Sequence, residues 1–492
     1  MAMDPPGSTT TTTHINNPSN SSSRRRSRSR SRCKKWENYL FVAMLLQSVA
    51  LIVLFEKFQG NVRENKLKHG QEFQATNNNN HDNTNDDPND GQTIITGGVE
   101  DQQLPFTFSA CLMIKDNNIL LPEWLAYHYT VLPLRRLIVG VDPLSHTDPK
   151  PILNAYGSIG MNISVWTNDS FWEDGREAHE KKDFQITNET DHEALRYRYK
   201  YRQKVFYKSC LQHLHDEMRT WTLLVDTDEY LAFNYYDEQE GPPTWCKKNV
   251  TCAKDYLKSI EDGTHLRTKL DRSPAATVAE HIDKHVDEQF DNVDKPCIIF
   301  GRYLFVSKDS SSSSSGREIQ RGVDPDFNAT LFHTFRYRHR SSLSSFQLGK
   351  PIVDVSRYDG RDLNNIHRPL GGMCTGGNAY VHNAAMSFRV HHYIGSWETF
   401  RQPGFDARGK DMFDKRNNVR DLVVDNTTPR YSPSGDSTWL TQFAKLVGKE
   451  KALELTQKMR IREELEMDEV ITEMGKGAQL HDWDKLNKKP GK

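Results

Sequence analysis

The sequence predicts an α/β protein in which a mixed sheet is flanked by helices and preceded by a single transmembrane helix and a disordered stem. Three observations support this prediction. An uncharged apolar run lies near the amino terminus, strand-like and helix-like segments alternate after residue 104, and one short apolar strand ends in three acidic residues. A β-α-β-α-β order is typical of the mononucleotide-binding half of a doubly wound sheet, whose ligands bind at the carboxyl ends of the strands.

The first 38 residues are predicted to be a disordered, basic cytoplasmic tail. They are rich in Ser, Thr and Asn and then in Arg, and they include an Arg-Ser repeat that ends at Arg32. Such a segment cannot bury a hydrophobic core. The repeat alone would resemble an RNA-splicing tail, but beside a membrane span it is explained as the positive charge that sets topology. The formal net charge of the chain is −1, so no nucleic acid is expected as a partner.

Residues 39–55 are predicted to be a transmembrane signal anchor. The run YLFVAMLLQSVALIVLF carries no charge, and as a helix it is about 26 Å long, enough for the thinner membranes of the early secretory pathway. Lys34, Lys35 and the arginines precede it, so the amino terminus should stay cytoplasmic and the rest of the chain should be luminal. No small-residue cleavage site follows, which favours an uncleaved anchor. The alternative is a buried core helix.

Cysteine use agrees with an oxidising, luminal location. Of seven cysteines, Cys33 falls on the cytoplasmic side, and the other six permit three disulfides. Cys246 and Cys252 enclose a short loop and are the predicted pair, whereas the remaining connectivity is open. Glycosylation sequons add support and lie at Asn162, Asn168, Asn188, Asn249, Asn328 and Asn426.

After a flexible polar stem over 56–103, the main domain is predicted to occupy 104–440. The second strand of this domain ends at Asp142, which is therefore placed on the ribose or base of a nucleotide. A charged helical tail is predicted over 441–492. Hydrophobic periodicity predicts the elements of the domain, with strands over 106–114, 137–141, 163–166 and 300–306 and within 329–337, and helices over 120–131, 152–156 and 192–218.

The central feature of the domain is the stretch W-T-L-L-V-D-T-D-E-Y-L over 221–231. The apolar run 223–225 has the length of a buried strand, and Asp226, Asp228 and Glu229 follow it at once. Carboxylates at the carboxyl end of a strand are well placed to hold Mn²⁺ or Mg²⁺, and the ion would bridge to the phosphates of a nucleotide. A solvated acidic turn is the alternative, because Asp-x-Asp occurs by chance in many chains.

A series of motifs comes in the order and approximate spacing of a known family. The motifs are Cys111 with Lys115, Glu123-Trp124-Leu125, Tyr127-His128, Cys210, Asp226-Thr227-Asp228-Glu229-Tyr230, Lys350-Pro351-Ile352-Val353, His367 and His391-His392-Tyr393. Over roughly residues 104–410 the chain resembles glycosyltransferase family 92, which contains galactosyltransferases of the secretory pathway. The resemblance implies the GT-A fold, a nucleotide-sugar-binding α/β sheet in which Asp-x-Asp holds Mn²⁺ against the donor diphosphate.

The resemblance also implies how the site binds metal and donor. Asp226 and Asp228 are the expected metal ligands, together with a late histidine. His392 fits the His-Tyr motif best, and His391 and His367 are its rivals. The residues expected to bind the nucleotide sugar are Lys115, Asp142, Asp226 and Asp228.

Transfer with inversion requires a base for the acceptor hydroxyl. Glu398 is the predicted base and acts beside Asp228, the other predicted catalytic residue. Asp406 and Glu229 are alternatives for the base. Three aromatic residues are expected either to stack on a sugar ring or to belong to the core, namely Trp397, Phe400 and Trp172.

The function hypothesis is a type II membrane glycosyltransferase of the Golgi or endoplasmic reticulum, with its catalytic head in the lumen. It is expected to depend on Mn²⁺ or Mg²⁺ and to transfer a hexose, galactose from UDP-galactose in the first instance, to a glycan acceptor with inversion. The alternative from another class is a catalytically inactive, lectin-like membrane protein of the same fold. A nuclear RNA-binding protein is the remote third option, through the Arg-Ser repeat.

Overall fold

The chain divides into two compact units, Met1–Asp87 and Pro88–Lys492, and the structure describes residues of the second. The predicted tail over 1–38, the predicted membrane span over 39–55 and most of the predicted stem lie outside the described residues. No helix among the described residues is long and apolar enough to cross a membrane. The computed structural model describes residues 92–95, 108–143, 145–167, 192–234, 250–261, 295–310, 322–342, 345–374, 388–400, 409–419, 422–426, 429 and 437–477.

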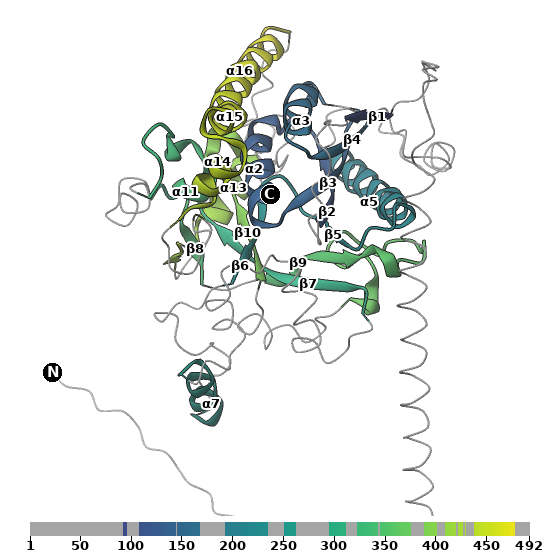
Figure 1. Ribbon diagram of the computed structural model, residues 1–492, viewed down its shortest axis with the longest axis vertical. Coiled ribbons are helices and arrows are strands. Elements are labelled where there is room, and N and C mark those ends of the chain that lie inside the picture. Colours follow the sequence, from purple (N-terminus) through teal and green to yellow (C-terminus); the bar gives the residue numbers. More distant parts are fainter. Residues whose placement is uncertain are drawn as a thin grey trace, which may run out of the picture. The chain divides into compact units, whose positions relative to one another are not determined.

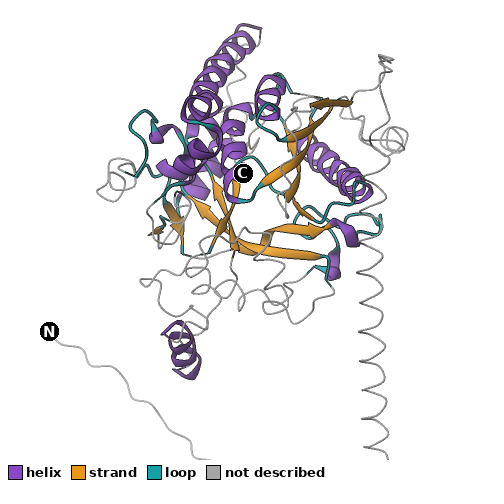
Figure 2. Ribbon diagram, viewed as in Figure 1, coloured by secondary structure: helices purple, strands orange, loops and turns teal. Residues whose placement is uncertain are grey.

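The second unit is a mixed α/β fold with one curled sheet flanked by helices (Figures 1 and 2), as the sequence predicts at this level. The strands run in the order β1-β4-β3-β2-β5-β9-β7-β10-β6, and β8 pairs with β7 and β11. Their bounds are β1 Gln92–Ile95, β2 Phe108–Ile114, β3 Leu134–Val141, β4 Asn162–Trp166, β5 Trp221–Leu223, β6 Glu229–Phe233, β7 Cys297–Phe305, β8 His339–Ser341, β9 Ser345–Asp354, β10 Phe388–Tyr393 and β11 Leu422–Val424.

The first part of the sheet confirms the predicted β-α-β-α-β order. Strands β2, β3 and β4 are parallel neighbours, connected by α2 (Leu121–Val131) and α3 (Lys150–Gly157). Every residue of β2 is buried, which suits a parallel strand covered on both faces. Strand β1 comes from the segment predicted as stem, and it pairs antiparallel with β4.

The chain then crosses the sheet. Helix α5 (His192–Asp216) leads from β4 to β5, which pairs with the opposite side of β2. A Cβ atom at Gly140 would lie 2.7 Å from the Phe206 ring, so this glycine allows α5 to pack closely on β3. A disulfide between Cys111 and Cys210 ties the helix to β2. The strand order therefore reverses between β2 and β5, which is the usual place for a ligand in such sheets.

The second part of the sheet is mixed. Strand β9 pairs antiparallel with β5 and β7, and β10 pairs parallel with β7 and antiparallel with β6. The predicted strand over 300–306 lies largely within β7. A second disulfide joins Cys297 and Cys374, whereas Cys246 of the predicted pair lies outside the described residues.

The prediction of strands within 329–337 is wrong. This segment forms the 3-10 turn η2 (Ala329–Leu331) and the short helix α11 (His333–Arg336). The Glu123 carboxylate accepts hydrogen bonds from the first backbone amides of α11, those of His333 and Thr334, both at 2.8 Å. A helix start satisfied by a residue 210 positions away leaves no signal in the local sequence.

The helices after residue 438 share the main hydrophobic core. Trp439 and Phe443 of α14 (Trp439–Val447) pack against α2, and Arg460 of α16 (Met459–Gly477) meets Glu123 at 3.2 Å. The predicted helical character of the tail is confirmed up to residue 477. The remaining helical elements are η1 Asn118–Leu120, α7 Val250–Glu261, η3 Val355–Arg357, η4 Gly371–Met373, α12 Trp397–Phe400, α13 Gly409–Asn417, α14 Trp439–Val447, α15 Lys449–Leu453, the π turn η5 Glu454–Lys458 and α16 Met459–Gly477.

Candidate metal and nucleotide site

The acidic stretch forms a turn at the point where the strand order reverses. β5 ends at Leu223, the buried residues Leu224 and Val225 follow, and the turn lies between β5 and β6. The Asn117 Nδ2 donates a hydrogen bond of 2.7 Å to the Thr227 Oγ1. This contact places the loop after β2 directly beside the turn after β5, so both lie at the carboxyl edge of the sheet.

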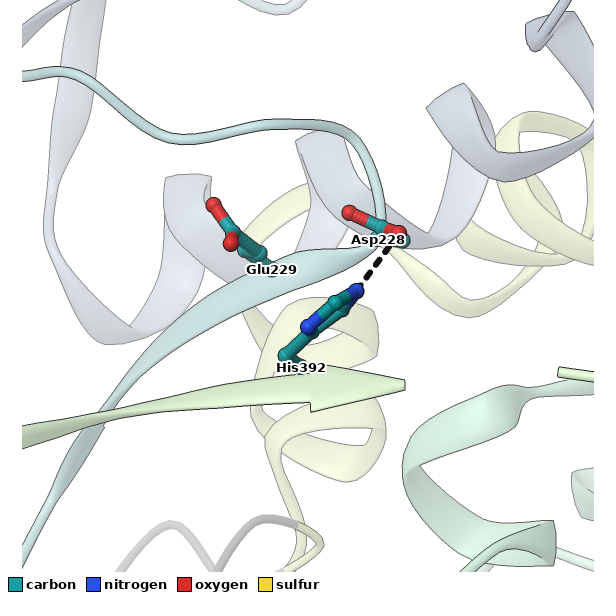
Figure 3. A group of neighbouring side chains, drawn as sticks. All are labelled: Asp228, Glu229 and His392. Atoms are coloured by element: carbon teal, nitrogen blue, oxygen red, sulfur yellow. Dashed lines mark hydrogen bonds and ion pairs between the residues drawn. The ribbon is translucent and has the colours of Figure 1, made fainter. Parts of the chain in front are cut away.

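Asp228 and His392 meet at this edge, although 164 residues separate them. The register of β10 and β6 places His392 opposite Glu229, and the Tyr393 amide donates to the Asp228 carbonyl at 2.9 Å. The His392 Nε2 then lies 3.0 Å from the Asp228 Oδ2 (Figure 3). Asp228, Glu229 and His392 each offer one ligand atom, and these atoms lie within 4.8 Å of one another.

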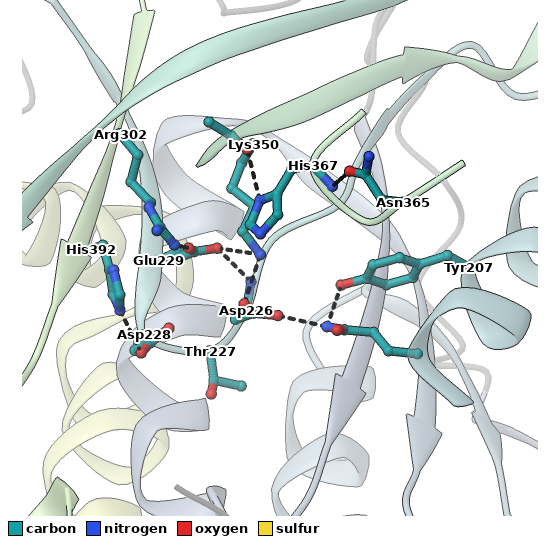
Figure 4. A network of polar contacts seen from close by, with 12 residues as sticks. Tyr207, Asp226, Thr227, Asp228, Glu229, Arg302, Lys350, Asn365, His367 and His392 are labelled. Atoms are coloured by element: carbon teal, nitrogen blue, oxygen red, sulfur yellow. Dashed lines mark hydrogen bonds and ion pairs between the residues drawn. The ribbon is translucent and has the colours of Figure 1, made fainter. Parts of the chain in front are cut away.

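Asp226 has a different environment from Asp228. Its Oδ1 accepts a hydrogen bond of 2.8 Å from the Gln203 amide, and its Oδ2 lies 2.6 Å from the Lys350 Nζ (Figure 4). Both carboxylate oxygens are therefore engaged by protein groups. Of the three predicted metal ligands, Asp228 and His392 lie together, and Glu229 lies with them. Asp226 is instead bonded to Gln203 of α5 and Lys350 of β9.

Glu229 is fully buried and lies between two cations. Its Oε1 accepts from the Arg302 guanidinium at 2.8 Å, and its Oε2 lies 2.9 Å from the Lys350 Nζ and 3.0 Å from the Asp226 amide nitrogen. Burial would raise the pKa of Glu229, but Lys350 and Arg302 lower it below its ordinary value. Glu229 is therefore held as a carboxylate, with both oxygens already bonded.

Lys350 connects the acidic turn to β9. Its side chain is fully buried and bridges Asp226 and Glu229. Burial would lower the pKa of Lys350, yet the two carboxylates raise it, so the ammonium keeps its charge. Neither Lys350 nor Arg302 has a predicted role from the sequence alone. The available signal was a cation beside the apolar residues of β7 and of β9, since a buried charge requires a partner.

The rival histidines lie elsewhere. Adjacent residues of a strand face opposite sides, so His391 points away from Asp228 and accepts at Nε2 a hydrogen bond of 2.7 Å from the Arg389 Nε. The His367 Nδ1 lies 3.0 Å from the Gly349 carbonyl oxygen (Figure 4). Burial, and then Lys350, lower the pKa of His367 to about 4. Neither histidine joins the group formed by Asp228, Glu229 and His392.

The residues predicted to bind the nucleotide sugar differ in their exposure to solvent. Lys115 lies at the carboxyl end of β2 and is partly exposed. Asp142 is buried, its amide donates to the Ile114 carbonyl, and its carboxylate lies 3.4 Å from the Arg202 guanidinium. A carboxylate already paired in the interior is poorly placed for the predicted contact with a ribose or base.

The predicted base and aromatic residues follow β10. Glu398 is exposed on the short helix α12 and is absent from the metal-ligand group. Phe400 is buried in a small cluster with Ile394 and Phe413, and Trp397 packs partly buried against it. Phe400 thus belongs to a core. Asp406 and Trp172 lie outside the described residues.

The carboxylate oxygen of Asp228 suits Mn²⁺, and the imidazole nitrogen of His392 is a ligand of divalent transition metals more generally. With the oxygens of Glu229 bonded to protein groups, Asp228 and His392 are the ligands best placed to bind it. The His392 Nδ1 is buried and has no hydrogen-bond partner among the described residues. Metal-ligating histidines usually donate from the second ring nitrogen, and His392 makes no such contact among the described residues. The imidazole is positioned by its place in β10 and by its contact with Asp228.

Comparison with protein-family models, curated proteins and solved structures finds no match for this chain.

Proposed function

We propose that this chain is a metal-dependent glycosyltransferase that moves a hexose, galactose from UDP-galactose in the first instance, to a glycan acceptor with inversion. The proposal extends the resemblance to family 92 and its GT-A fold. The observation that carries it is the pairing of Asp228 with His392 at the carboxyl edge of the sheet, where the strand order reverses. A nucleotide diphosphate and a divalent cation suit this position.

Two protein ligands are few for a divalent cation, which usually completes its shell with substrate phosphates and water. Asp228 and His392 would hold Mn²⁺, and the bound ion would neutralise charge on the departing diphosphate. Lys350, Gln203 and Arg302 would keep the acidic turn in place before the donor arrives. Their bonds to Asp226 and Glu229 fix the backbone that presents Asp228.

The acceptor side is assigned from the sequence. Glu398 is proposed as the base that takes the proton of the acceptor hydroxyl, and its exposed position on α12 leaves it accessible to an acceptor. A Glu398→Gln variant is expected to lower the transfer rate about 10²- to 10⁴-fold, the usual contribution of a positioned base. It should leave donor binding unchanged, and a variant with full transfer activity would remove Glu398 from the mechanism.

The proposed location is the Golgi or endoplasmic reticulum membrane, with 39–55 as the anchor of a single-pass type II protein. The two disulfides of the described residues suit an oxidising lumen. Protease protection of the head in sealed microsomes tests this topology. Cleavage of the head without membrane permeabilisation would contradict it.

Hydrolysis and transfer assays on the detergent-solubilised full chain test the activity. UDP-galactose with Mn²⁺ should be turned over, and Asp228→Asn should lower the rate at least about 100-fold if its carboxylate holds the metal in the transition state. Asp216→Asn, in an exposed carboxylate at the end of α5, is the matched control and should be silent. Turnover that survives Asp228→Asn would contradict the site, and glycan binding without turnover would favour the lectin-like alternative.

A further inference from the structure

A buried aspartate organises the two loops that lie next to the acidic turn. Asp116 follows β2, and its side chain is 1% exposed. Its Oδ1 accepts hydrogen bonds from the amides of His146 and Thr147, at 2.5 and 2.9 Å, and from the Thr147 hydroxyl at 3.2 Å. Its own amide donates to the Ser145 Oγ at 3.0 Å. One carboxylate thus holds the loop after β3 against the loop after β2.

The remaining oxygen of Asp116 orients an exposed imidazole. Asp116 Oδ2 lies 2.9 Å from the His146 Nδ1, and the His146 side chain is 47% exposed. A carboxylate only accepts, so it keeps the proton of a neutral imidazole on Nδ1 and leaves Nε2 as a hydrogen-bond acceptor. The Asp116–His146 pair therefore presents a fixed acceptor to solvent, and the described residues offer it no protein partner.

The backbone at Asp116 supports a functional role. Asp116 has a φ of 53°, in the left-handed region that costs energy for a residue other than glycine. The strain is offset by the hydrogen bonds that its carboxylate and amide make to the loop after β3. Such strained positions cluster at ligand-binding sites, and this one carries the orienting carboxylate of an exposed imidazole.

The pair lies at the same sheet edge as the metal ligands. Asn117, the next residue after Asp116, donates to Thr227 between Asp226 and Asp228. The contacts therefore run from His146 to Asp116, and from the adjacent Asn117 to the acidic turn. In the sheet, β2 has β5 on one side and β3 on the other. A nucleotide whose diphosphate lies at the acidic turn after β5 would extend its nucleoside toward β3, where His146 lies.

We infer that His146 is a donor-binding residue that accepts, at Nε2, a hydrogen bond from a hydroxyl or N–H group of the nucleoside. The inference rests on the proposed function. It gives His146 the nucleoside contact predicted for Asp142, whose carboxylate is buried against Arg202. His146 contacts the donor away from the reacting atoms, so it sets donor affinity and takes no part in the chemical step.

Calorimetric titration of the detergent-solubilised full chain with UDP and with inorganic pyrophosphate, both in the presence of Mn²⁺, tests this inference. His146→Ala should weaken UDP binding between about two- and tenfold, the usual worth of one hydrogen bond, and should leave pyrophosphate binding unchanged. His215→Ala is the matched control, because His215 is also exposed and also meets an aspartate, Asp216, but in the last turn of α5, which leads into the start of β5. It should change neither affinity.

A second variant tests the orienting carboxylate. Asp116→Asn removes the charge that fixes the tautomer, and it should weaken UDP binding at least as much as His146→Ala while the disulfide-bonded head stays folded by circular dichroism. Unchanged UDP affinity in His146→Ala would overturn the inference. An equal loss of UDP and pyrophosphate affinity would also overturn it.

The outcomes separate this inference from the proposed function. If Asp228→Asn weakens UDP binding and His146→Ala does not, the proposed metal site is supported and the proposed nucleoside contact is contradicted. If the wild-type chain binds neither UDP nor pyrophosphate with Mn²⁺, both fall together.

Discussion

Two buried glutamates, in two regions of the molecule, have opposite electrostatic environments. Glu229 in the acidic turn faces Lys350 and Arg302, and these cations lower its pKa despite burial. Glu123, between α2 and α16, faces one cation, Arg460, and burial raises its pKa above the ordinary value even though Arg460 and the hydrogen bonds of His333 and Thr334 act against it. Within the turn the contrast belongs to Glu229, because burial raises the pKa of Asp226 as it raises that of Glu123.

The difference indicates what each region does. The Glu229 carboxylate and its two cations, Lys350 and Arg302, can keep their charges whether or not a ligand is bound, which suits a preorganised site. At the helix junction, the Glu123 oxygens mainly satisfy the first amides of α11 and link it to α16. The Glu123 carboxylate therefore stabilises the packing of these helices.

The largest effect is expected from removing the cation of the turn. Lys350→Met leaves two carboxylates facing each other near β9, and breaking such a buried pair costs about 3–5 kcal/mol. Urea unfolding of the purified chain, followed by the fluorescence of its tryptophans, measures the loss. Lys208→Met is the matched control, since its ion pair with Asp362 is exposed and is worth less than about 1 kcal/mol. Equal losses in both variants would show that Lys350 is not the centre of a buried network.

A smaller effect is expected at the helix junction. Glu123→Gln keeps one acceptor oxygen for Thr334 but removes the buried counter-charge of Arg460, which then keeps its longer contact of 3.5 Å with Glu464. We expect a loss of about 1–3 kcal/mol in the free energy of unfolding. The same urea experiment measures it. A loss larger than that of Lys350→Met would reverse the order of the two regions.

The pH dependence of these losses should have opposite signs. The folded-state pKa of Glu229 is depressed, so its stabilisation is present above the unfolded value of 4.5 and is lost as the pH falls through the folded pKa. The folded-state pKa of Glu123 is raised, so its contribution is fully present below 4.5 and is lost as the pH rises through the folded pKa.

Unfolding free energies at pH 5 and pH 8, with EDTA present, compare the two residues. The loss caused by Glu229→Gln should be at least as large at pH 8 as at pH 5, and the loss caused by Glu123→Gln should be smaller at pH 8. Two losses that change in the same direction with pH would contradict the electrostatic contrast between the two regions.

The smallest effect is expected at the edge of the sheet. Removal of residues 1–91 keeps β1, whereas removal of residues 1–103 exposes the edge of β4 that β1 covers. The second truncation should lower the melting temperature relative to the first by about 1–2 °C, since about 1 kcal/mol shifts it by roughly 2–4 °C in a domain of about 150–250 residues and by less in a larger unit such as Pro88–Lys492. Identical melting temperatures would assign β1 to the stem, as the sequence predicts.

The sequence predicts the first part of the fold well because its signals are local. Strands β2, β3 and β4 and helices α2 and α3 lie within a few residues of their predicted bounds, since each carries its own hydrophobic period. Helix α11 was predicted as a strand because its start depends on Glu123, far away in the chain. Contacts of this range have no local signature.

The candidate site divides in the same way. The acidic turn was predicted from the strand that precedes it, and His392 from the resemblance to a family. The hydrogen bonds from Gln203 and Lys350 to Asp226 were not predictable, because α5 and β9 come close to the turn only in the folded protein. The burial of Asp142 against Arg202 was missed for the same reason.

Binding of Mn²⁺ by the full chain, followed by electron paramagnetic resonance with and without UDP, tests the central claim most directly. With two protein ligands, Asp228 and His392, the ion should bind much more tightly when UDP is present, and both Asp228→Asn and His392→Ala should abolish that gain while Asp216→Asn leaves it intact. Tight Mn²⁺ binding that is indifferent to UDP, or that survives the loss of Asp228, would contradict the claim that this edge of the sheet holds a metal together with a nucleotide diphosphate.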